Sequence, residues 1–202
     1  MNHNDEYNIN KKSQLEEELF ESCREINVQK TIHLLTTDSK IKPSINARTK
    51  NGATPLIISC ANGSQEMIDF FLNSPDLTEH ADITLKNNNG YDAFLTSVLM
   101  NRLDLIKYFL NNDSIRKKIN VDIRNNKNEN AIMLASRMNY MDIVNYLILE
   151  ENFIVDVDTK NWLNGNNEFS QKYQETLNII NYKEFNSNLP NLNPKPILKT
   201  KI

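Results

Sequence analysis

A self-similarity with a fixed period of 38 residues constrains the fold of this chain more than any other feature. Residues 45–72 reappear without a gap as residues 83–110 and again as residues 121–148. Equivalent positions keep their character: Gly52, Gly90 and Asn128; Leu56, Phe94 and Ile132; Gly63, Asn101 and Asn139; Ile68, Ile106 and Val144; Phe71, Phe109 and Leu147. Such a period predicts stacked copies of one supersecondary unit, because each copy buries its apolar face only against its neighbours.

Each copy predicts a short extended piece, a turn tip and two helices. The tip ends at Gly52, Gly90 or Asn128, residue types that tolerate the left-handed backbone region. An N-cap residue then opens the first helix at Thr54, Asp92 or Asn130. That helix is expected to end at Gly63, Asn101 or Asn139. The second helix follows with apolar residues at i and i+3 or i+4, at Met67, Ile68, Phe71 and Leu72; Leu105, Ile106, Phe109 and Leu110; and Val144, Leu147 and Ile148.

The segment Gly52-Ala53-Thr54-Pro55-Leu56, followed by Ala61-Asn62-Gly63, resembles the ankyrin repeat, although Ile57 replaces the histidine of the family's T-P-L-H signature. The ankyrin period is about 33 residues. The additional residues fall in the connectors 73–82 and 111–120, and the spacing from Val121 to Val155 contracts to 34 residues. The resemblance implies an all-α ankyrin-repeat solenoid of helix-turn-helix units with short β-hairpin-like fingers.

The units at both ends depart from this pattern. Ser13 and Glu16 have the spacing of a capping box, and Ile32 and Leu35 align with Ile68 and Phe71 at a spacing of 36 residues, so a helix pair without a finger is expected first. The expected organisation is a disordered leader (1–12), an N-terminal capping helix pair (13–43), three ankyrin repeats (44–81, 82–119 and 120–153), a degenerate C-terminal capping repeat (154–185) and a disordered, proline-containing tail (186–202).

Composition and motifs argue against catalysis. The formal net charge is −3, and the three histidines and two cysteines have no metal-ligand spacing, so neither a metal nor a cofactor is expected. The chain shows no apolar run long enough to span a bilayer and no export signal, which predicts a soluble, cytoplasmic protein. Cys23 and Cys60 are expected to be buried small residues. The protein is predicted to be a monomer and not an enzyme.

The candidate binding residues follow from the resemblance, which implies a concave surface formed by the finger tips and the ends of the first helices. A basic residue precedes each tip, and further cations lie on the tips themselves. The predicted contact residues are Arg48, Lys50, Asn51, Lys86, Asn88, Asn89, Tyr91, Leu99, Met100, Arg124, Lys127, Arg137 and Met138. Aromatic, methionine and arginine side chains are enriched in protein interfaces. A partner protein with an acidic face is therefore the predicted ligand.

Several alternatives remain open from the sequence alone. The array is either a simple binding module or an adaptor that links a target to cellular machinery, such as host ubiquitin machinery. The basic residues before the tips are also compatible with nucleic-acid binding, although aromatic residues are scarce among them and the whole chain is acidic. Finally, Leu99 and Met100 either form part of a contact surface or pack between neighbouring units.

Overall fold

The computed structural model describes residues 3–151, 153, 155–165 and 170–187, and every regular element in that part of the chain is helical. In chain order the helices are α1 (His3–Arg24), α2 (Val28–Thr36), α3 (Pro55–Asn62), α4 (Gln65–Asn73), α5 (Ala93–Leu99), α6 (Leu103–Asn111), α7 (Asp113–Arg116), α8 (Ala131–Met138), α9 (Met141–Asn145), the π-helical turn η1 (Tyr146–Glu150), α10 (Val157–Gly165) and α11 (Ser170–Ser187). The predicted all-α solenoid is confirmed. None of the helices in the described ranges has both the length and the apolarity needed to cross a membrane.

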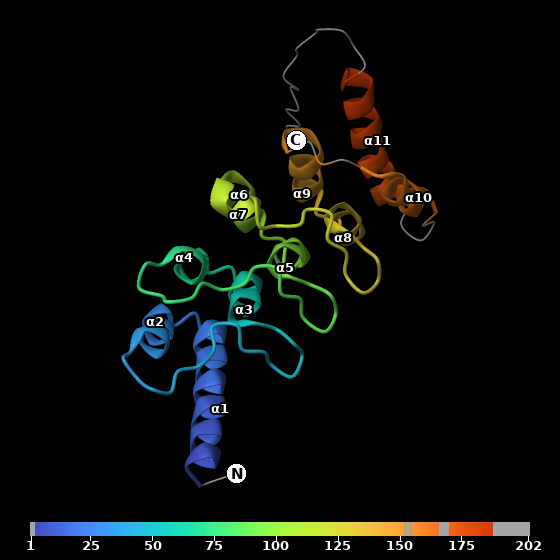
Figure 1. Ribbon diagram of the computed structural model, residues 1–202. Coiled ribbons are helices and arrows are strands. Elements are labelled where there is room, and N and C mark those ends of the chain that lie inside the picture. Colours follow the sequence, from blue (N-terminus) through green and yellow to red (C-terminus); the bar gives the residue numbers. More distant parts are fainter. Residues whose placement is uncertain (1–2, 152, 154, 166–169, 188–202) are drawn as a thin grey trace.

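The helices form two rows along one axis (Figure 1). The inner row contains α1, α3, α5 and α8, each packed on the next, and the outer row contains α2, α4, α6 and α9. The loops before α3, α5 and α8 project from the same side of the stack, opposite the outer row (Figure 1). These loops are named finger 1 (45–53), finger 2 (83–91) and finger 3 (121–129).

The local signals in the sequence explain where the repeat helices begin and end. Thr54, Asp92 and Asn130 each accept a hydrogen bond from a backbone N–H of the first turn, at 3.3, 2.8 and 3.0 Å respectively. The predicted N-caps are thus confirmed. The reversals between paired helices have positive φ angles of 79°, 56° and 62° at the expected residues, Gly63, Asn101 and Asn139.

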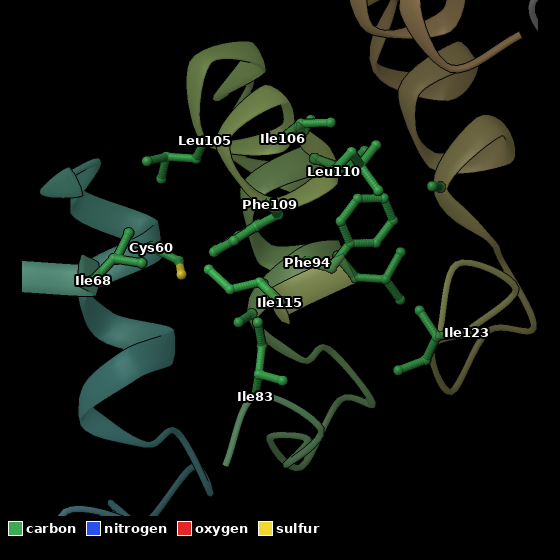
Figure 2. Packing of buried hydrophobic residues seen from close by; sticks show 14 of the residues in the cluster. Cys60, Ile68, Ile83, Phe94, Leu105, Ile106, Phe109, Leu110, Ile115 and Ile123 are labelled. Atoms are coloured by element: carbon green, nitrogen blue, oxygen red, sulfur yellow. The ribbon is translucent and has the colours of Figure 1, made fainter. Parts of the chain in front are cut away.

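A continuous apolar layer holds neighbouring units together. Figure 2 shows side chains of successive units gathered in this layer, with Cys60 and Ile68 from one unit facing Phe94 and Phe109 from the next. Each finger contributes one buried isoleucine to it, at Ile45, Ile83 and Ile123. Cys23 and Cys60 are fully buried, as expected. Because this core is shared between units, no unit buries its apolar face alone.

The N-terminal unit differs from its prediction in two ways. Helix α1 begins at His3, so the expected disordered leader is wrong for residues 3–12, and Ser13 lies inside the helix instead of capping it. The alignment of α2 is also off by one residue. Ile26 takes the left-handed position with φ 56°, and Thr31 is buried in the place that Ile32 was expected to fill. The capping-box spacing of Ser13 and Glu16 therefore predicted a helix start where α1 continues, since no helix-breaking residue lies upstream.

The C-terminal unit is a helix pair without a finger. A degenerate capping repeat was expected over residues 154–185; in the structure α10 begins at Val157, and Asp156 caps it by accepting a hydrogen bond from the Thr159 N–H at 2.6 Å. Leu163 of α10 and Ile180 of α11 are buried against the preceding unit. Residues 186 and 187 belong to α11, whereas the rest of the predicted tail, residues 188–202, lies outside the described residues.

Candidate functional site: the finger surface

The three fingers close like small hairpins and stack on one another through their backbones. Within the fingers, the N–H groups of Thr49, Asn87 and Asn125 donate to the carbonyls of Ala53, Tyr91 and Glu129 at 2.9–3.0 Å. Between the fingers, the N–H of Asn88 donates to the Asn51 carbonyl and the N–H of Asn126 to the Asn89 carbonyl, both at 3.0 Å. The finger edge is therefore a hydrogen-bonded ladder, which fixes the spacing of the tips.

Asparagine side chains reinforce this ladder. The Asn88 amide donates to the Lys50 carbonyl at 3.0 Å, and the Asn126 amide donates to the Asn88 carbonyl at 2.8 Å. Of the residues predicted to contact a partner, Asn51, Asn88 and Asn89 thus also join the fingers. All three residues are exposed, so they remain accessible to a partner although they also join the fingers.

The three basic residues before the tips lie in a row, as the repeat predicted, and each reaches toward the next unit. Arg48 donates to the Lys86 carbonyl, and Lys86 Nζ donates to the Arg124 carbonyl at 3.1 Å. Arg124 ends the row with an ion pair to Asp156 at 2.7 Å. This row consequently has a structural role in holding successive units in register, which sequence reasoning did not assign to it.

The two tip lysines differ from that row. Lys50 and Lys127 are exposed, and within the described residues their ammonium groups form no hydrogen bond or ion pair. Lys50 lies in finger 1 and Lys127 in finger 3, at neighbouring positions of the repeat. They are therefore the cations of the predicted set that are best placed to meet an acidic partner.

A buried carboxylate organises the junction between finger 3 and α8. Glu129 is only 4% exposed and pairs with Arg137 at 2.6 Å, while the Asn125 amide donates to it at 2.8 Å. Burial works to raise the pKa of Glu129, but the Arg137 guanidinium and the Asn125 amide outweigh burial and hold that pKa below its usual value. The same amide reaches the Tyr91 hydroxyl at 3.0 Å, which fixes the ring of Tyr91 against finger 3.

The predicted apolar contacts divide into two groups. Leu99 and Met138 are half-buried and pack against the core, which favours the interpretation that they join neighbouring units. Met100, at the end of α5, is 45% exposed. It is the apolar member of the predicted set that the fold leaves open to a partner.

Sequence reasoning missed Asn125 and Asp156. Asn125 occupies the position of Thr49 and Asn87, and in all three fingers this side chain accepts hydrogen bonds from backbone N–H groups of its own turn. The 38-residue spacing was the available signal for that position. Asp156 had no such signal, because its role depends on the loss of the fourth finger.

The described residues contain no group of three or more His, Cys, Asp or Glu side chains that could hold a metal ion. Burial raises the pKa of the Cys23 thiol to about 11, and it raises the pKa of the fully buried Cys60 thiol as well. Both cysteines are therefore held as neutral thiols at neutral pH, in the form that is not nucleophilic.

Comparisons with known proteins agree with this architecture. The family described as "Ankyrin repeats (3 copies)" matches residues 19–118 and 75–161. Tyrosine-protein kinase HTK16 of Hydra vulgaris is 40% identical over 60 residues, a match that covers 30% of this chain and 8% of that protein. Repeats of this family generally bind other proteins and are generally not catalytic. The family match spans well over half of the sequence, so this chain belongs to the ankyrin-repeat family.

Proposed function

We propose that the chain binds a partner protein along the finger surface and that the bound face of the partner is acidic. The observation that carries this proposal is the pair of exposed tip lysines, Lys50 and Lys127, whose ammonium groups form no hydrogen bond or ion pair within the described residues. Exposed cations without hydrogen bonds or ion pairs of their own attract and orient a complementary surface more than they stabilise the fold. Met100 adds exposed apolar area at the end of an inner helix.

Rigidity of the finger edge also supports this proposal. Four hydrogen bonds join the tips of successive fingers, two from backbone and two from side-chain donors. A surface whose contact groups are already fixed loses less conformational entropy on binding, which favours affinity. The row of Arg48, Lys86 and Arg124 contributes to that rigidity, since each of these side chains has an acceptor in the next unit.

The test is an affinity capture from cell lysate with a variant that carries Met100→Ser and Lys127→Glu. Neither side chain contributes to the ladder, so the fold should persist, and thermal melts followed by circular dichroism check this. We expect the captured partner to be reduced at least tenfold. A matched control carries Tyr182→Ser and Lys118→Glu, which change an equally exposed apolar residue, 45% in both cases, and one exposed lysine away from the fingers.

Equal capture by both variants would contradict the placement of the site. A nucleic-acid ligand gives a different result in the same experiment: nuclease treatment would remove the captured material, and its retention would fall steeply with salt.

A further inference from the structure

Finger 1 has a neighbouring finger on one side only, because the N-terminal unit consists of α1 and α2 without a finger. In fingers 2 and 3, the tip N–H groups of Asn88 and Asn126 donate to the preceding finger at 3.0 Å. The counterpart in finger 1 is the N–H of Lys50, which has no acceptor in the described part of the chain. The carbonyl of Arg48 is likewise without the donor that its counterparts at Lys86 and Arg124 receive.

A depression of about 530 Å³ lies where a preceding finger would stack. Its lining comes from α1, from finger 1 and from α3: Glu17, Arg24, Thr49, Lys50, Asn51, Ala53 and Ile58. Ala53 contributes only a methyl group to this lining. The depression thus combines open backbone groups, an apolar floor at Ala53 and Ile58, and charges of both signs.

We propose that this depression, named the finger slot, binds a tight turn of a partner protein that takes the place of the missing finger. This inference rests on the proposed function and specifies how the partner engages one end of the surface. The partner's turn presents a backbone carbonyl to the Lys50 N–H, as Asn51 and Asn89 do to the fingers that follow them. A Lys or Arg three residues earlier in that turn donates to the Arg48 carbonyl, as Lys86 donates to Arg124.

The ladder also sets a steric requirement on the occupant. A Cβ atom added at Gly52 or Gly90 would come within 2.9 or 2.7 Å of the backbone nitrogen of the next finger, closer than real contacts allow. A turn that enters the finger slot therefore needs glycine one position after its accepting carbonyl, in the place of Gly90 after Asn89. Glycine also supplies the positive φ of that position, which is 83° at Gly90.

A synthetic probe tests the slot without knowledge of the natural partner. The probe is a cyclic peptide with the sequence of residues 83–92, which is finger 2 and the residue after it. The control peptide differs only by Gly90→Ala, so its charge and length are the same. Each peptide is titrated into the full-length, isotope-labelled protein, and amide chemical shifts are recorded.

We expect the probe to shift the amides of Lys50, Asn51, Ala53 and Arg24, and the control peptide to bind at least tenfold more weakly. Ile58→Trp in the protein places a larger side chain in the slot and should abolish the shifts, whereas Tyr182→Ser should leave them unchanged. The proposal is overturned by equal binding of the two peptides, by shifts confined to other surfaces, by binding that survives Ile58→Trp, or by no shift at millimolar probe.

Failure of the finger-slot proposal is distinguishable from failure of the proposed function. The peptide reports on the finger slot alone, whereas the Met100→Ser and Lys127→Glu variant reports on the part of the surface formed by the end of α5 and by finger 3.

Discussion

The tips of fingers 1 and 2 end in glycine, whereas the tip of finger 3 ends in Asn128, although all three residues have nearly the same backbone conformation. Their φ angles are 73° at Gly52, 83° at Gly90 and 61° at Asn128. Gly52 and Gly90 each have another finger stacked directly against them, and no finger follows Asn128. Backbone conformation alone therefore does not explain the glycines. Close stacking does, and asparagine suffices where stacking ends.

The largest effect is expected from Gly90→Asn, which keeps a residue type that accepts a positive φ but adds a Cβ against the Asn126 nitrogen. Overpacking of this kind should lower the free energy of unfolding by about 3 kcal/mol. Urea denaturation of the purified variant measures it. The reciprocal change, Asn128→Gly, is the control and should alter stability by less than about 0.5 kcal/mol. Similar losses for both variants would show that stacking does not distinguish the two tips.

The helix caps next to these tips also differ: the cap behind finger 2 is more deeply buried than the cap behind finger 3. Asp92, behind finger 2, is 2% exposed, whereas Asn130, behind finger 3, is half-buried. Burial raises the pKa of Asp92 to about 6, against the hydrogen bond from Leu95 and the charge of Lys86, which act to lower it. Because the folded-state pKa lies above the unfolded value of 3.8, the native state binds the extra proton, and stability should fall as the pH rises from about 4 to 6.

Asp92→Asn removes this titration while keeping a side chain that can cap the helix, as Asn130 does. We expect the variant to be more stable than the parent by about 2 kcal/mol at pH 7 and about equally stable at pH 4. Urea melts at both pH values measure the difference. A variant that is less stable than the parent at pH 7 would mean that the cap needs its charge.

The side-chain rungs of the ladder should have smaller effects. Asn126→Ala removes the hydrogen bond from its amide to the Asn88 carbonyl and should cost about 1 kcal/mol. Lys50→Ala, at the corresponding position of finger 1, removes no such bond and should be neutral. The two chemical-denaturation midpoints are the measurement, and equal losses would contradict the assignment of the rungs.

The smallest effect concerns the N-terminal reversal, where the other units have glycine or asparagine. Ile26 has φ 56° and is 47% exposed, an unfavourable conformation for a β-branched residue. Ile26→Asn should raise the free energy of unfolding by about 0.5 kcal/mol, which a thermal melt detects as a higher midpoint. A lower midpoint would mean that the Ile26 side chain makes a stabilising contact worth more than the relief of its backbone strain.

The repeat period explains why so much of this fold could be predicted from one sequence. Thr54, Asp92 and Asn130 share a position, so each supported the others, and the same holds for Gly63, Asn101 and Asn139. The terminal units have no such support. Ser13 and Glu16 looked like a helix start because no second copy was present to contradict them, and α10 was hidden because Asp156-Val157-Asp158 begins like a finger.

For the surface, the sequence placed the cations but not their partners. The repeat put Arg48, Lys86 and Arg124 in one row, whereas their acceptors are backbone carbonyls and one carboxylate of the following unit. Every residue has a backbone carbonyl, so the sequence does not indicate which carbonyls accept these hydrogen bonds. For this reason the division between structural cations and the open lysines Lys50 and Lys127 required the structure.

The most direct test of the finger surface is hydrogen–deuterium exchange of the chain with and without its captured partner. We predict that the partner slows exchange in the three finger segments, 48–53, 86–91 and 124–129, and leaves exchange in α4 and α6 of the outer row unchanged. Protection confined to the outer row, with the fingers unaffected, would contradict the account.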